Sequence, residues 1–207
     1  KRYREMALHP EADSAIEDVV NEAIVSDLYD SPIEIELSNV NASDKLKNII
    51  REEFKRIKDI MDFDKKSHEI FRNWYVDGRV FYLKVIDQKK PEEGIQDLRY
   101  IDPLKIRHIR QEKKKNKAKL GPDLGPRDKD KFQSPELEEY FVYTPKPSYP
   151  TGTMVGGGGV KGIKISKDSI TYCTSGLVDR NKGNVLSYLH KAIKSLNQLR
   201  MIEDSLV

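Results

Sequence analysis

Apolar residues recur at spacings of three and four in four parts of the chain, which predicts four amphipathic helices. These segments cover residues 11–28, 43–61, 64–77 and 184–207. Pro10 suits the start of the first helix, Ser43 is a candidate N-cap for the second, and Gly78 is a candidate C-cap for the third. Asn184 is a candidate N-cap for the last helix, whose apolar stripe continues to Leu206.

Alternating or β-branched segments between these helices predict strands. Ile33, Ile35 and Leu37 alternate with glutamates, as in a half-buried strand. Further strands are expected at residues 80–86, 98–101, 106–109 and 140–143, and a closing hairpin within residues 163–172. Because helices and strands do not alternate regularly, a doubly wound parallel sheet is disfavoured. The pattern predicts an α+β fold, with amphipathic helices packed on a small, mostly antiparallel sheet or partial barrel and a long terminal helix.

The composition is polar for an independent globular protein. Of the 207 residues, 37% are hydrophobic and 34% charged, against averages of about 45–50% and about 25%. This balance suits a piece of a larger assembly or a domain with exposed charged loops. The chain's start at Lys1 instead of Met also leads us to expect a fragment. No apolar run approaches the roughly 18 residues of a membrane-spanning helix. Cys173 is the only cysteine, which excludes an intrachain disulfide and a zinc site made of cysteines.

Charge is balanced overall, at +3, but not along the chain. Ten acidic residues and no Lys or Arg lie between Glu11 and Asp44, whereas eight basic residues and one acid lie between Lys105 and Lys119. The basic run lies at the start of an aperiodic loop, about residues 111–135, and a solvated loop is its simplest interpretation. The alternative is a weak contact with DNA or another partner. The lysines concerned are Lys113, Lys114, Lys115, Lys117 and Lys119.

No arrangement of residues predicts catalysis. Gly157, Gly159 and Gly162 fit the dinucleotide-binding spacing but lack the strand before them and the helix after them. The four histidines are scattered without metal-ligand spacing, and Cys173 is expected to be a small buried hydrophobe. We therefore expect a protein that is not an enzyme and has no cofactor or metal.

Several blocks along the chain resemble the portal vertex protein of T-even-type, contractile-tailed bacteriophages. The first lie in residues 2–6, 14–16 and 21–25, and a long one reads Phe71-Arg72-Asn73-Trp74-Tyr75-Val76-Asp77-Gly78-Arg79-Val80-Phe81-Tyr82. Others are Leu98-Arg99-Tyr100-Ile101-Asp102-Pro103, Ser187-Tyr188-Leu189-His190-Lys191-Ala192-Ile193-Lys194 and Asn197-Gln198-Leu199-Arg200-Met201-Ile202-Glu203-Asp204. The resemblance implies a wing-like α+β domain over residues 1–183 and the start of a truncated stem helix over residues 184–207.

The resemblance also implies a structural role. The family forms a twelve-membered ring of identical subunits at one capsid vertex, which nucleates head assembly, docks the terminase motor and joins the head to the neck and tail. Double-stranded DNA passes through this ring during packaging and ejection. The implied partners are other copies, the major capsid protein, the scaffold, the terminase large subunit and neck proteins. The implied location is the virion, after assembly inside the bacterial host.

The last helix supplies the candidate subunit or stem contacts: Leu199, Ile202, Leu206, Arg200 and Glu203. Its stripe is longer than the preceding strands could cover, so residues 199–207 should be less buried than Leu189 and Leu196. The alternative function, from a different class, is a nucleic-acid-binding module that uses the basic segment 105–119.

Overall fold

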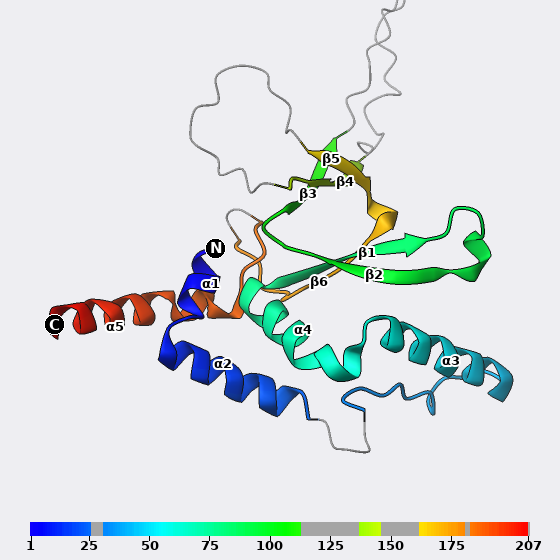
Figure 1. The fold of residues 1–207 in the computed structure, drawn as a ribbon, viewed down its shortest axis with the longest axis horizontal. Helices are drawn as coiled ribbons and strands as arrows, with labels where there is room; N and C mark the ends of the chain where they lie inside the picture. The colour runs from blue at the N-terminus through cyan, green and yellow to red at the C-terminus, as the bar shows by residue number, and fades with distance from the viewer. Residues whose placement is uncertain (26–30, 113–136, 146–161, 181–182, 207) are drawn as a thin grey trace, which may run out of the picture. The chain divides into compact units, whose positions relative to one another are not determined.

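The computed structural model describes residues 1–25, 31–112, 137–145, 162–180 and 183–206 (Figure 1). The chain forms two compact units. The larger unit contains Lys1–Pro103 and Thr171–Val207, and the smaller unit contains Leu104–Ile170. Helices and small antiparallel sheets are both present, as the α+β prediction required, and the described strands form no closed barrel.

The larger unit begins with four helices: α1 (Arg2–Met6), α2 (Pro10–Ala23), α3 (Asp44–Ile60) and α4 (Phe63–Asp77). The predicted end signals are confirmed. Pro10 lies in the first turn of α2, the Ser43 side chain accepts a hydrogen bond from the Leu46 amide at 3.4 Å, and Gly78 ends α4 with a φ of +72°. α2 ends at Ala23, five residues before the predicted end.

The main core of the larger unit lies between the helices and the segment that leads to the C-terminal helix. Its buried members are Ala7, Ile16, Val20, Val76 and Leu189. Burying an apolar side chain of this size contributes about 1.5–3 kcal/mol. Arg4 adds a polar tie, because its guanidinium donates to both carboxylate oxygens of Asp77, at 2.8 and 2.6 Å, and to Asp102 at 2.7 Å. These hydrogen bonds raise the pKa of Arg4 and fix α1 against the end of α4.

A three-stranded sheet in the larger unit has the order β2-β1-β6. Its strands are β1 (Arg79–Ile86), β2 (Ile95–Ile101) and β6 (Ile170–Thr174). β1 and β2 are antiparallel, with Phe81 opposite Ile101, and α4 packs against β1. The predicted strand 80–86 is therefore confirmed as the central strand. Cys173 is exposed on the edge strand β6, so the prediction that it is buried was wrong.

The smaller unit contains a second antiparallel sheet of order β3-β4-β5. Its strands are β3 (Ile106–Glu112), β4 (Leu137–Tyr143) and β5 (Ile163–Ser166). Phe141, in the central strand, is fully buried, and the His108 ring stacks on it with ring centroids 4.7 Å apart. Ile106 and Val142 of the same sheet are also buried, at 2% and 5% exposed.

Three predicted elements differ from the structure. Residues 33–37 form no strand, because no described segment pairs with their backbone amides and carbonyls. The expected closing hairpin is absent, because β5 pairs with β4 whereas β6 joins the other sheet. The last helix does not begin at Asn184: a 3₁₀ helix covers Tyr188–Ala192 and α5 covers Ile193–Leu206. None of the described helices has the length and apolar character needed to cross a membrane.

Candidate subunit-contact surface

The start of the C-terminal helical segment is fixed to the end of α4. Ser187 is fully buried; its hydroxyl donates to the Tyr75 carbonyl at 3.2 Å and accepts from the Leu189 amide at 3.0 Å. A Cβ atom at Gly78 would lie only 2.5 Å from the Leu186 carbonyl oxygen. Glycine is therefore required at this crossing for two reasons, its positive φ and the close approach of the backbone.

Aromatic rings surround this attachment point. Tyr188 stacks on Tyr75, with ring centroids 5.0 Å apart and planes 5° apart, and packs beside Trp74 at 5.3 Å. On the neighbouring turn, His190 contacts Tyr3 through a 2.9 Å hydrogen bond between its Nδ1 and the Tyr3 hydroxyl. The 3₁₀ helix Tyr188–Ala192, which leads directly into α5, is thus held by side chains of both α1 and α4.

Burial decreases along the segment toward the C-terminus. Leu189 is 7% exposed, Leu196 and Leu199 are half-buried, Ile202 is 57% exposed and Leu206 is 81% exposed. The prediction that the end of the stripe is less buried than Leu189 is confirmed for Ile202 and Leu206. Leu199 has the same burial class as Leu196, so the change begins after Leu199.

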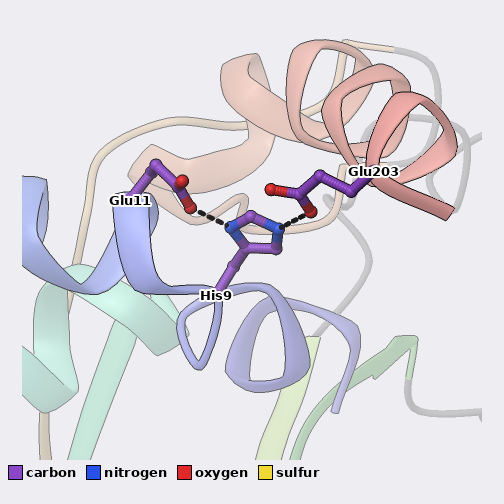
Figure 2. A group of neighbouring side chains, drawn as sticks. All are labelled: His9, Glu11 and Glu203. Carbon is purple, nitrogen blue, oxygen red and sulfur yellow. Dashed lines mark hydrogen bonds and ion pairs between the residues drawn. The ribbon is translucent and has the colours of Figure 1, made fainter. Parts of the chain in front are cut away.

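Glu203 joins the C-terminal half of α5 to the rest of the larger unit. Its carboxylate lies 3.1 Å from Nε2 of His9, at the start of α2 (Figure 2). Leu206 follows three residues later on the same side of the helix. The Leu206 side chain is nevertheless 81% exposed, so the described residues of the larger unit leave most of it uncovered.

The two charged candidates on α5 already have partners within the chain. Arg200 lies 3.9 Å from Asp204, one turn away, and both side chains are mostly exposed. Exposed pairs of this kind contribute about 0.3–0.5 kcal/mol, so Arg200 could exchange its partner at little cost. Glu203 contacts His9, a pairing across 194 residues that no local pattern in the sequence could indicate.

A second apolar surface lies on α3 and the sheet of the larger unit. None of the residues of α3 is buried, and Leu46, Ile49 and Ile57 are all exposed. A cavity of about 560 Å³ opens beside the helix, and Ile57, Trp74 and Leu98 are among its lining residues. The buried Trp74 indole nitrogen has no hydrogen-bond partner among the residues that the structure describes. The spacing of apolar residues in the sequence predicted the apolar face of α3, but it could not show that so little of the chain packs against this face.

The whole chain, residues 1–207, matches the profile of the family described as bacteriophage T4-like portal protein (Gp20). This chain belongs to that family. Among curated relatives, the portal protein of Vibrio phage KVP40 is 32% identical over 213 aligned residues, covering all of this chain and 38% of the relative. The portal protein of Salmonella phage ViI is 29% identical over 217 aligned residues, covering all of this chain and 36% of the relative.

Family membership bears on the surfaces just described. The chain spans little more than a third of the length of these portal proteins. The other candidate contacts of this portal-family chain, Lys113, Lys114, Lys115, Lys117 and Lys119, lie outside the described residues. On the described part of the basic segment, Arg110 pairs with Glu139 at 2.8 Å.

Proposed function

We propose that this chain is part of a structural subunit of a phage portal ring, and that the apolar end of α5 contacts another segment of the subunit or a neighbouring copy. The observation that carries the proposal is the decrease in burial from Leu189, in the 3₁₀ helix attached to α4, to Leu206 at the end of α5. Exposed Ile and Leu at the end of a helix are typical of a surface that another chain or segment covers.

The wider role that we propose is supported by membership of the portal family. Such a ring would stand at one capsid vertex of the virion, nucleate head assembly, dock the terminase motor and connect the head to the neck and tail. Double-stranded DNA would pass through its channel during packaging and ejection. In this role the chain needs no catalysis of its own, and its many exposed charges suit contacts with capsid, scaffold and neck proteins.

A nucleic-acid-binding role for residues 105–119 has less support. The described half of this segment lies in β3, where Arg110 is paired with Glu139 instead of presenting a free charge.

The proposal can be tested in a full-length portal protein that contains this chain. Leu206→Lys places a charge on the exposed apolar end of α5, and Asn197→Lys adds the same charge to an exposed position on the opposite side of the helix. Native mass spectrometry should show that Leu206→Lys reduces ring assembly at least tenfold, while Asn197→Lys assembles like the parent. Equal assembly of both variants would contradict a contact at Leu206.

A further inference from the structure

Two glutamates surround His9 at the junction between α2 and α5. The Nδ1 atom of His9 lies 2.7 Å from a carboxylate oxygen of Glu11, and the Nε2 atom lies 3.1 Å from a carboxylate oxygen of Glu203. Figure 2 shows the imidazole between the two carboxylates, with Glu203 reaching it from α5. Each residue offers one potential ligand atom to a metal ion, and these three atoms lie within 4.8 Å of one another. No other group of three His, Cys, Asp or Glu side chains in the described part of the chain meets this distance.

Hydrogen bonding within the cluster leaves the imidazole incompletely satisfied. Nδ1 is buried, yet its 2.7 Å contact with Glu11 is an ion-pair distance without the alignment of a hydrogen bond. A ring nitrogen shielded from water in this way is well placed to give its lone pair to an ion.

The charges of the cluster do not balance. Two carboxylates carry two negative charges, and an imidazolium would neutralise only one of them. A neutral imidazole with a divalent cation would balance the cluster completely. The side chains of Glu11 and Glu203 are 58% and 45% exposed, so both carboxylates can rotate toward an ion without disturbing the core.

We propose that His9, Glu11 and Glu203 form a binding site for a divalent cation of the Zn²⁺ type. Imidazole and carboxylate are both ligands of Zn²⁺, at about 2.0–2.2 Å, and water would complete a tetrahedral arrangement. Ligand atoms of such a site are about 3.3–3.6 Å apart. Because Glu11 and Glu203 contact opposite nitrogens of the ring, one of the two carboxylates must rotate to the nitrogen that holds the ion. Mg²⁺ prefers oxygen ligands and an octahedral shell, which favours Zn²⁺ at a site that includes an imidazole.

The site would have a mechanical effect. His9 is the N-cap residue of α2, whereas Glu203 lies in the last turns of α5. An ion held by both would connect the two helices at the point where α5 leaves the unit, and would fix the direction of α5. This site does not depend on the proposed portal function.

Isothermal titration of the purified chain, without a histidine tag, tests the site directly. Zn²⁺ should bind one per chain with micromolar affinity, and Mg²⁺ should bind at least tenfold more weakly. His9→Ala and Glu203→Gln should each weaken Zn²⁺ binding at least tenfold. The matched controls are His68→Ala and Glu17→Gln, which remove an exposed histidine and an exposed glutamate elsewhere in the larger unit and should leave binding unchanged.

Thermal unfolding gives a second readout that separates metal binding from a purely structural salt bridge. Saturating Zn²⁺ should raise the melting temperature of the parent chain and of both controls, but not that of Glu203→Gln, whose far-ultraviolet circular dichroism should match the parent. The proposal is overturned if the parent takes up no Zn²⁺, or if His9→Ala and Glu203→Gln bind it as well as the controls do.

Discussion

Gly78 is the residue at which the sequence constrains the attachment of α5 most tightly. Gly78→Ala would place a methyl group 2.5 Å from the Leu186 carbonyl oxygen in addition to the strain of a positive φ. We expect the substitution to lower the free energy of unfolding by about 3–4 kcal/mol. Urea unfolding followed by the fluorescence of Trp74, the single tryptophan, measures this directly.

Gly176 provides the matched control, because its φ is +75° but a Cβ would meet no atom of the described residues within 4 Å. Gly176→Ala should therefore cost only the strain of the left-handed backbone, about 1–2 kcal/mol. Equal losses for the two variants would show that the close approach of Leu186 to Gly78 has no energetic importance.

His108 should make the smaller unit sensitive to mild acid. Burial, followed by the positive charge of Arg110, lowers the pKa of His108, although Glu139 raises it and Lys167 again lowers it. As the pH falls, His108 is therefore protonated in the unfolded chain before it is protonated in the folded chain, because the unfolded chain keeps the ordinary pKa of about 6.5. Stability from the neutral ring is present above that pH and is lost as the pH falls through the lower pKa of the folded state.

Hydrogen exchange in β3 and β4 at pH 7 and pH 5 checks this expectation. Protection factors, corrected for the intrinsic pH dependence of exchange, should fall at pH 5 in the parent and change much less in His108→Gln. This range lies above the titration of Glu139, whose pKa is lowered chiefly by a hydrogen bond from Lys167. A parent whose protection is the same at both pH values would rule out this role for His108.

At the scale of the element, the C-terminal helical segment should divide into a structural base, the 3₁₀ helix Tyr188–Ala192, and a surface end in α5. Leu189→Ala removes a side chain from the core and should cost about 2–5 kcal/mol of unfolding free energy. Leu206→Ala, at a position 81% exposed, should cost under about 0.5 kcal/mol in the chain alone. Urea unfolding compares the two variants, and a large loss for Leu206→Ala would mean that the end of α5 is already packed.

Elements with local signals could be predicted from the sequence. α3 and α4 have an apolar period together with capping residues, Ser43 and Gly78, and both were found with nearly the predicted bounds. The β-branched and aromatic run of β1 was equally clear. These signals lie within one segment, so neighbouring residues are sufficient to define the element.

Elements that depend on distant partners could not be predicted in this way. Residues 163–172 have strand character, but a short 3₁₀ turn at Lys167–Ser169 separates β5 and β6 into different sheets. Residues 184–187 have no helix-breaking Gly or Pro, yet they remain extended because Leu186 hydrogen-bonds to Leu177 and Ser187 to Tyr75. The His9–Glu203 contact joins residues near opposite ends of the chain, and only the fold reveals it.

At the scale of the whole molecule, we expect the isolated chain to be mainly monomeric. A ring built from heterologous contacts needs two complementary faces on every subunit, and this chain spans little more than a third of its relatives' length. Sedimentation velocity at micromolar concentration should show a mass near the 23.9 kDa of one chain. A stable closed ring formed by residues 1–207 alone would show that these residues contain both faces.

The most direct test of the central claim is electron cryo-microscopy of a full-length portal protein that contains this chain. The account predicts closed rings with a central channel, in which Ile202 and Leu206 are buried against another segment or a neighbouring copy. Rings in which the apolar end of α5 stays in solvent, or a full-length protein that forms no ring, would contradict it.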